Sequence, residues 1–470
     1  MSIELLSRQN PWWIDKESIN RDPYIQEFED SALKWHPDFL HKVRTDQDVI
    51  YVILGPRQVG KTTSFKLLIK MLLEKKEILP RGILYFNCDE ISPQTPQMLS
   101  ELINEYLSWS KELPGRRYVF IDEATYLTDW ERGVKILADR GALAGVTVFA
   151  TGSHLMGLRR GAERLPGRRG KGEELDIFLY PLNFREYLMV LKNEPQEKLP
   201  SFPGWDFQEL FKAGQEVSLY RDEISSLFES YLRSGGFPRS IRDYRMSSNI
   251  KPGTYKLYRD GFVGDLVRMG RRELLFRELA QWIINRRENP FEWSDAARET
   301  YVGTHPTVRE YIEDAEASFI WRVFYKIKEI GKPYRAPRSP KRVYFNDPFI
   351  FHTLRGWVLG HPNPFQATEE FLNDPSNLGY LIENLVASHL RRSCGENIYY
   401  WKDGGEIDFI VFETGVKKVL IEVKYQKRVS SANFKNLNKW GKGVVLTQDY
   451  LALEEGNVFI PVPYFLSLLT

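Results

Sequence analysis

Short apolar runs alternate with stretches of helical periodicity over the first 180 residues of the chain. Each run is bounded by polar or turn-forming residues, as buried strands are. Strands that alternate with helices pair in parallel, with helices on both faces of the sheet. We therefore predict an α/β domain with a five-stranded parallel sheet. Its strands are expected at Val49–Leu54, Gly82–Asn87, Tyr118–Ile121, Val146–Ala150 and Leu175–Tyr180.

The central region shows helical periodicity and then alternating, strand-like periodicity. Leu274–Arg287 predicts an amphipathic helix, a second helix begins at Ser294, and a third spans Pro306–Ala315 after a short glycine turn. The alternating stretch Trp321–Arg342 predicts a hairpin. Three helices followed by a hairpin are typical of a winged helix.

Composition bounds the class of protein. With 470 residues, 42% hydrophobic and 27% charged, the chain predicts a globular protein of several domains. It contains no uncharged apolar run of about 18 residues and no secretory start, so we expect a cytoplasmic protein without a membrane partner. Cys88 and Cys394 lie too far apart in sequence to indicate a disulfide framework.

A glycine-rich segment directly follows the first predicted strand. Gly55-Pro56-Arg57-Gln58-Val59-Gly60-Lys61-Thr62 fits the pattern G-x-x-x-x-G-K-[ST], and helical periodicity begins at Thr63. In such a loop the backbone N–H groups and the lysine bind phosphates, and the threonine hydroxyl binds magnesium. A chance glycine turn is the alternative, but the flanking strand and helix favour a site for ATP and Mg²⁺ over residues 55–63.

Polar residues follow two further strands of this sheet. Asp122 and Glu123 end the strand Tyr118–Ile121, where ligands bind in open α/β sheets. We expect Asp122 to hold magnesium and Glu123 to act as general base on the attacking water. A helix cap is the alternative for this acidic pair. Thr151 and Ser153 follow the strand Val146–Ala150, which should neighbour the P-loop strand.

An arginine-rich loop lies between Leu158 and Gly170, with five arginines and one glutamate in thirteen residues. It is either solvated charge or a supply of arginine for phosphate, in this molecule's site or in a neighbour's. Arg168 is our first candidate to face phosphate. An arginine directed at a neighbour would make the protein a homo-oligomer.

The hairpin stretch is strongly basic and predicts contact with DNA phosphates. A solvated edge strand or a protein-binding winged helix is the alternative. Glu310, Glu313 and Asp314 in the third helix argue against sequence-specific base reading. Against the single acid Glu329, the stretch carries Arg322, Lys326, Lys328, Lys332, Arg335, Arg338, Lys341 and Arg342.

Three charged residues mark the C-terminal region. Asp408 follows a glycine turn, and strand alternation in Leu420–Tyr425 places Glu422 and Lys424 on one face. This spacing resembles the PD-(D/E)xK nucleases, in which the acids hold magnesium and the lysine positions water. Glu383, in a predicted helix, is a candidate third ligand beside Asp408 and Glu422. A surface Glu-Lys pair is the alternative.

Together these motifs resemble a family of prokaryotic, largely archaeal, AAA-type ATPases with a restriction-endonuclease-like C-terminal domain. The resemblance implies that Thr151 or Ser153 orients the lytic water, and that Pro238 in a helical lid touches the nucleotide. A plain helix end is the alternative for Pro238. The resemblance covers nearly the whole chain and rests on Trp12-Trp13, the P-loop, Asp122-Glu123, Thr151-Gly-Ser153, Gly167-Arg168, Pro181–Tyr187 and Gly235–Pro238.

The sequence thus predicts an ATPase core at 1–181, a helical lid at 182–250, a winged helix at 251–345 and a nuclease-like domain at 346–470. The expected function is ATP-driven binding or remodelling of DNA, branched or ended, with metal-dependent cleavage as a further hypothesis. The alternative is a nucleotide-gated switch with a protein-binding winged helix and an inactive nuclease fold.

Overall fold

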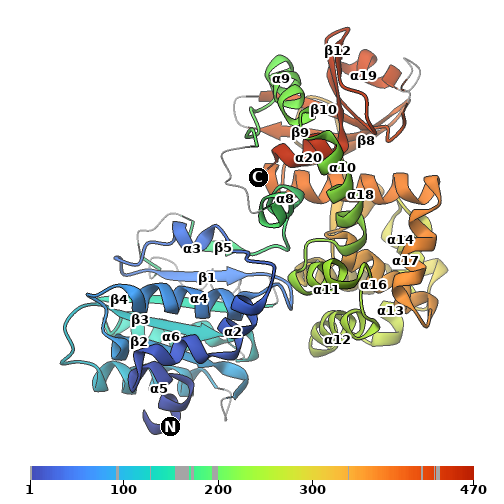
Figure 1. Cartoon of the computed structure of the whole chain (residues 1–470). Helices are drawn as coiled ribbons and strands as arrows, with labels where there is room; N and C mark the ends of the chain where they lie inside the picture. The colour runs from blue at the N-terminus through green and yellow to red at the C-terminus, as the bar shows by residue number, and fades with distance from the viewer. Residues whose placement is uncertain are drawn as a thin grey trace. The chain divides into compact units, whose positions relative to one another are not determined.

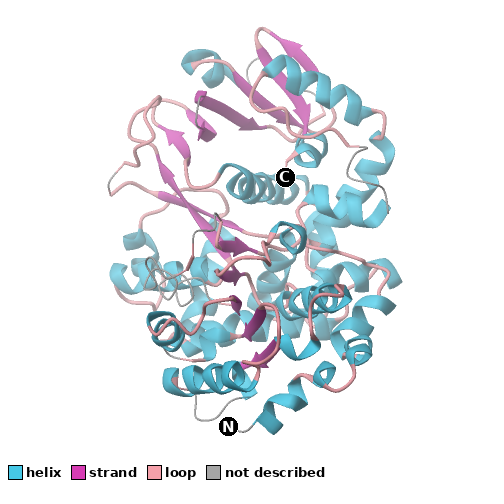
Figure 2. Cartoon of the chain, turned by 90° about the vertical axis from the view of Figure 1, so that its left-hand side faces the viewer, coloured by secondary structure: helices cyan, strands magenta, loops and turns pink. Residues whose placement is uncertain are grey.

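The computed structural model describes residues 3–90, 95–127, 129–153, 169–170, 174–192, 199–336, 338–413, 416–427, 429 and 434–469. The chain folds into two compact units, Met1–Tyr180 with Ala317–Phe319, and Pro181–Glu316 with Ile320–Thr470 (Figure 1). Both units combine strands with helices (Figure 2). Within the described ranges, every helix is too short or too polar to traverse a lipid bilayer.

The first unit is built on a sheet of five parallel strands in the order β2-β3-β4-β1-β5, which confirms the predicted sheet. Strands β1, β3 and β4 are buried along their whole length, which explains their continuous apolar runs. The strands are β1 (Ile50–Leu54), β2 (Ile83–Asn87), β3 (Arg117–Asp122), β4 (Val146–Gly152) and β5 (Asp176–Phe178). The helices are α1 (Ile3–Gln9), α2 (Pro23–Asp30), α3 (Phe39–Lys42), α4 (Lys61–Glu74), α5 (Pro96–Trp109) and α6 (Trp130–Asp139).

The second unit contains one mixed sheet of eight strands in the order β12-β13-β11-β10-β9-β8-β6-β7. The strands are β6 (Trp321–Lys326), β7 (Lys341–Phe345), β8 (Ile398–Lys402), β9 (Glu406–Glu413), β10 (Val416–Val423), β11 (Gly443–Thr447), β12 (Ala452–Glu454) and β13 (Asn457–Pro461). The helices are α8 (Phe184–Lys192), α9 (Phe207–Ser218), α10 (Arg221–Ser234), α11 (Pro238–Ser247), α12 (Pro252–Arg268), α13 (Glu273–Arg286), α14 (Trp293–Glu299), α15 (His305–Ala317), α16 (Pro348–Leu359), α17 (Pro364–Leu372), α18 (Pro375–Cys394), α19 (Lys435–Trp440) and α20 (Val462–Leu468).

The hairpin of the predicted winged helix belongs to this larger sheet. Strand β6 pairs antiparallel with β7, and its other edge pairs parallel with β8 through Tyr325 and Tyr399. This second pairing satisfies backbone groups that an isolated hairpin would leave exposed at its edge. The predicted domain boundary after residue 345 therefore falls inside one sheet.

The predicted lid segment is helical, and close packing explains the glycines before α11. A Cβ on Gly235 would lie 2.1 Å from a carboxylate oxygen of Asp347, and one on Gly236 would lie 2.0 Å from the carbonyl oxygen of Leu182. The Gly236 N–H also donates to Asp347 at 2.8 Å. Pro238 then occupies the first turn of α11, where proline is favoured. These contacts match the alternative of a plain helix boundary, and a nucleotide contact by Pro238 stays a prediction.

Candidate nucleotide site and the ion cluster of the second unit

The loop between β1 and α4 has a backbone that requires glycine at two positions. A Cβ on Gly55 would lie 2.3 Å from the carbonyl oxygen of Leu179, so no larger residue fits there. Gly60 adopts a left-handed conformation with φ of +103° and directly precedes α4. The loop therefore leads its backbone into the N-terminus of a fourteen-residue helix, an arrangement that favours bound anions.

Lys61 is the first residue of α4 and is almost fully buried. Its ammonium group donates to the carbonyl oxygens of Gly55 at 3.0 Å and Pro56 at 2.9 Å. The positive charge is thus held over the loop that precedes the helix. This is the place where the lysine of a P-loop meets the β- and γ-phosphates.

The carboxylate of Asp122 is buried and accepts hydrogen bonds from groups near the carboxyl ends of neighbouring strands. One oxygen accepts from the Thr62 hydroxyl at 2.8 Å and from the Tyr85 hydroxyl at 2.9 Å. The other accepts from the Thr151 hydroxyl at 2.5 Å and from the Glu123 N–H at 3.1 Å. The structure thus brings Thr62, Asp122 and Thr151 together, as expected from their positions after parallel strands.

The donor set beside the loop fits magnesium. The Thr62 hydroxyl and the Asp122 carboxylate are hard oxygen ligands, which Mg²⁺ prefers, and they lie 2.8 Å apart. Both face the start of α4, where a bound nucleotide would present its phosphates. Ser153 is also buried, directly after β4, but Thr151 is the residue that bonds Asp122.

Glu123 lies immediately after β3 in a strained backbone conformation. Its φ of 50° is left-handed, which is uncommon for a residue other than glycine. Its N–H donates to the hydroxyl of Thr151 at 3.0 Å, which helps to fix this conformation. Such strain concentrates at functional sites and is consistent with the role predicted for Glu123. Arg168 lies outside the described residues.

In the second unit, Asp408, Glu422 and Lys424 lie together as their spacing predicts. The Lys424 ammonium is 2.8 Å from a carboxylate oxygen of Glu422 and 3.4 Å from one of Asp408. Asp408 also accepts from the N–H of Val423 at 2.8 Å. Asp408 of β9 is thereby linked to the end of β10 by a backbone hydrogen bond and by Lys424.

The buried Arg342 also belongs to this cluster, although the sequence predicts it in the basic stretch that contacts DNA. The guanidinium of Arg342 is 3.3 Å from Glu383, 3.9 Å from Asp408 and in contact with Glu406. The side chain is only 1% exposed. The prediction that Arg342 contacts DNA as part of the basic stretch is therefore wrong, because its side chain is buried at this position of β7. Arg322 is buried as well.

Cations of the chain itself lie against the carboxylates of this cluster, and metal binding by it stays a prediction. Among the described residues, no group of three or more His, Cys, Asp or Glu side chains is placed to hold a metal ion. Burial raises the pKa of Glu383 to about 7 and that of Glu422 to about 8. Burial also acts on Asp408, but Lys424 and Arg342 outweigh it and lower the pKa of this carboxyl. The three predicted metal ligands, Glu383, Asp408 and Glu422, are thus paired with cations of the chain itself.

Comparison with known proteins bears on the first unit. The model of the AAA domain matches residues 47–188, which include the loop at Gly55, Asp122 and Thr151. We refer to the first unit as the AAA domain, after the family model that it matches. Two models described as domains of unknown function match the second unit, DUF8612 at residues 225–359 and DUF4143 at residues 378–465.

Relatives and solved structures add little about activity. Uncharacterized proteins of Methanocaldococcus jannaschii (MJ1637) and Haemophilus influenzae are 25% and 24% identical, covering 91% and 78% of this chain and 86% and 80% of theirs. The Walker-type ATPase PABY2304 of Pyrococcus abyssi gives a TM-score of 0.41 at 14% identity, covering 73% of this chain and 95% of that one. Aeropyrum pernix ORC1, solved in complex with DNA, gives 0.32 at 13%, covering 76% and 98%. At such scores neither similarity informs on function.

Tyr85, on the edge strand β2, was not predicted as a site residue, but its hydroxyl donates to Asp122 of the AAA domain. Burial, and then the charge of Asp122, raises the pKa of Tyr85 well above its usual value, so its hydroxyl remains a donor. The ammonium of Lys66 lies 3.6 Å from the centre of the Tyr85 ring and 3.1 Å from Asp22. Tyr85 is thus held on both its ring and its hydroxyl.

The N-terminal segment fixes β2 in place. The Asn10 amide donates to the Tyr85 carbonyl at 2.7 Å and accepts from the Tyr85 N–H at 2.6 Å. The indole N–H groups of Trp12 and Trp13 both donate to the carbonyl of Ile83, at 3.2 and 2.7 Å. Side chains therefore take the place of a further strand along this edge of the sheet.

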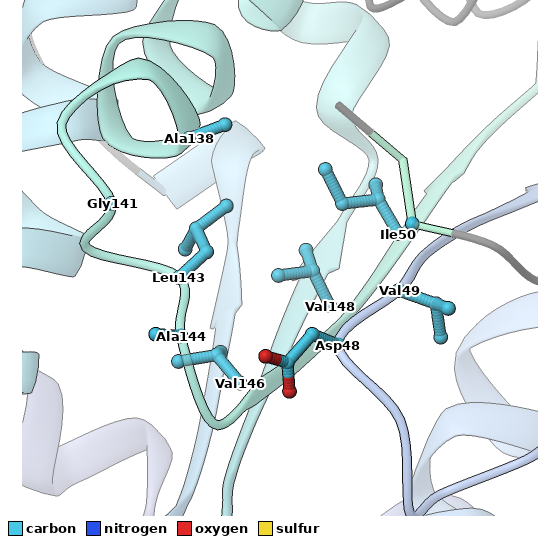
Figure 3. Close-up of a pocket in the computed structure, with 10 residues that line it drawn as sticks. Asp48, Val49, Ile50, Ala138, Gly141, Leu143, Ala144, Val146 and Val148 are labelled. Carbon is cyan, nitrogen blue, oxygen red and sulfur yellow. The ribbon is translucent and has the colours of Figure 1, made fainter. Parts of the chain in front are cut away.

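A small pocket lies at the amino-terminal ends of β1 and β4, the opposite end of these strands from the nucleotide site. It has a volume of about 280 Å³ and lies where β1 and β4 begin, lined by Val148, Leu143 and Asp48 (Figure 3). Both carboxylate oxygens of Asp48 are bonded, one to Arg116 at 2.5 Å and one to the Gly145 N–H at 3.1 Å. The remaining lining is mainly apolar.

Proposed function

We propose that this protein hydrolyses ATP with Mg²⁺ in its AAA domain and binds DNA through its second unit. The single observation that carries the ATPase proposal is the convergence of Thr62, Thr151 and the Glu123 N–H on the buried Asp122 carboxylate. These groups come from the ends of three adjacent elements, and together they supply the acidic half of a phosphate site.

The residues divide the work of phosphoryl transfer. Lys61 and the loop N–H groups bind the β- and γ-phosphates, while Thr62 and Asp122 hold Mg²⁺, which neutralises phosphate charge when bound. Glu123 accepts a proton from the water that attacks the γ-phosphorus, as the bond to the β–γ bridging oxygen breaks. The Thr151 hydroxyl bonds both the Asp122 carboxylate and the Glu123 N–H, and so fixes their positions for this step.

Tyr85→Phe is expected to raise the Mg²⁺ concentration for half-maximal ATP turnover about tenfold, because a hydrogen bond to a charged group contributes about 1.5–3 kcal/mol. The maximal rate at saturating Mg²⁺ should change little. Tyr106→Phe is the matched control, since it removes a buried hydroxyl that donates to the Arg81 carbonyl at 3.1 Å. An unchanged Mg²⁺ requirement in Tyr85→Phe would assign Tyr85 a purely structural role.

Exposed cations support DNA binding by the second unit. Lys328, Arg335 and Arg338 are exposed on the segment between β6 and β7. Charges of the third helix, α15, are instead paired within the protein, with Arg309 bonded to Glu313 of the same helix at 2.7 Å and Glu310 bonded to Arg271, before α13, at 2.7 Å. We therefore assign DNA contact to the connecting segment rather than to α15, and to phosphates rather than bases.

Reversal of charge at Arg335 and Arg338 tests this assignment. The double change to glutamate should weaken binding to duplex DNA of any sequence and reduce the log-log salt slope by about 0.9 for each lost contact. Linear, nicked and four-way-junction DNA should also stimulate ATP turnover by the wild-type protein. Affinity and slope that both survive the reversal would assign this segment to a protein contact or a solvated edge.

A nucleotide-gated switch with an inactive nuclease fold is the second candidate, and the ion cluster around Arg342 favours it. Cation and carboxylate groups already compensate one another there, and within the described part of the chain no group of three or more His, Cys, Asp or Glu side chains is placed to hold a metal ion. Slow ATP turnover that no DNA structure changes would support the switch over the DNA-stimulated ATPase.

A further inference from the structure

A pocket of about 650 Å³ opens in the second unit beside the end of α13, β6 and β8. Its size lies within the range of small-ligand pockets. Among the described residues, those that line it include three cations, Arg286, Lys326 and Lys402, and two amides, Asn285 and Asn289, but no carboxylate. The pocket is therefore rich in donors and poor in charged acceptors, as a site for an anion is.

The neighbouring carboxylates leave donor capacity on the three cations. Lys402 lies 3.2 Å from Glu406, Lys326 lies 3.9 Å from Asp403, and Arg286 lies 3.5 Å from Glu299. Each cation thus has one carboxylate partner in an ion pair, whereas an ammonium has three donors and a guanidinium five.

Arg286 adds a more specific observation. Its Nε is buried without a hydrogen-bond partner, and its guanidinium lies 4.7 Å from the centre of the Trp282 ring. The side chain as a whole is 31% exposed, so its other guanidinium N–H groups are the ones that can meet an acceptor in the pocket.

The pocket adjoins the ion cluster described above. Tyr400 lines the pocket, and the guanidinium of Arg342 lies 4.8 Å from the centre of its ring. Glu406 pairs with Lys402 on the pocket side and with Arg342 on the cluster side. Cationic side chains therefore line the pocket and also lie in the adjoining cluster.

We propose that this pocket binds a phosphate group of a nucleic-acid strand directly, through Arg286, Lys326 and Lys402, without a divalent metal. The inference deepens the proposed DNA binding and is independent of ATP hydrolysis. Arginine and lysine both recognise phosphate, the former as a planar fork and the latter as a point charge. The pocket volume leaves room for the sugar attached to that phosphate.

The test is the affinity of the full-length protein for a labelled single-stranded oligodeoxynucleotide, measured by fluorescence anisotropy in EDTA without ATP. Lys326→Ala with Lys402→Ala should weaken binding at least tenfold and reduce the log-log salt slope by about 0.7, the value for one phosphate contact on a single strand. The control Lys212→Ala with Lys256→Ala removes two exposed lysines of the same unit and should leave affinity nearly unchanged.

A second variant guards against misfolding. Asn285 is exposed, so Asn285→Asp adds a negative charge at the pocket without removing a buried group, and it should also weaken binding several-fold. Pocket variants that bind like the control would overturn the proposal, as would wild-type binding that EDTA abolishes. Displacement of the oligonucleotide by equimolar dAMP or pyrophosphate would assign the pocket to free phosphates instead. ATP binding at the P-loop, measured in parallel, separates failure here from failure of the ATPase proposal.

Discussion

Glu123→Gln is expected to lower ATP turnover by about 10²–10⁴-fold, the usual contribution of a general base, while ATP binding persists. Glutamine keeps the shape of the side chain but cannot accept a proton from water. The ground-state contacts to phosphate come from Lys61 and the loop, which this change leaves intact. Turnover is read as steady-state phosphate release, and binding as equilibrium affinity for ATP with Mg²⁺.

Glu112→Gln provides the control, because it neutralises an exposed carboxylate of the same unit. Its turnover should equal that of the wild type. Ordinary turnover in Glu123→Gln would remove Glu123 from the role of base and shift attention to another group at the sheet edge.

Arg342→Met is expected to destabilise the second unit by about 3–5 kcal/mol, because it leaves buried carboxylates without their cation. Glu383 and Asp408 would then share a dry site with Lys424 alone. Adding Glu383→Gln to Arg342→Met should recover part of the loss, since one of the uncompensated charges is removed. Hydrogen exchange of the backbone amides in β7 and β9, followed by mass spectrometry, reports the change locally.

The matched control is Arg338→Met, in the exposed segment before β7, where a surface substitution should change stability by no more than about 0.5 kcal/mol. Equal, small effects of both substitutions would contradict the buried cluster. They would return Arg342 to the DNA-facing strip that its sequence neighbours suggest.

The AAA domain was the more predictable half. Its strands are short buried runs, so Val49–Leu54 and Tyr118–Ile121 predict β1 and β3 to within a residue or two. Because parallel strands end at one edge, the placement of Thr62, Asp122 and Thr151 followed from their positions alone. The contact of Tyr85 with Asp122 could not be predicted in this way. Tyr85 lies in the apolar run of β2, and its neighbours in sequence do not indicate that its hydroxyl bonds Asp122.

The second unit was less predictable, because its long-range pairings join distant segments. The alternating pattern around Trp321–Lys326 indicates a hairpin correctly, but only the pairing with β8, more than 70 residues later, makes it part of a larger sheet. Arg342 on β7 is buried by groups from other distant segments, Glu383 of α18 and the ring of Tyr400 on β8. Basic residues in a row look equivalent in sequence, and burial alone separates Arg342 from exposed Arg335 and Arg338.

The loop from Gly55 to Thr62 is expected to bind Mg-ATP for hydrolysis. Phosphate release from ATP by the purified wild-type protein, compared with Lys61→Ala, tests it most directly. We expect release by the wild type that requires Mg²⁺ and is almost abolished in Lys61→Ala, which loses the ammonium group held over the loop. Equal, Mg²⁺-independent release by both proteins, or no ATP binding by the wild type, would contradict it.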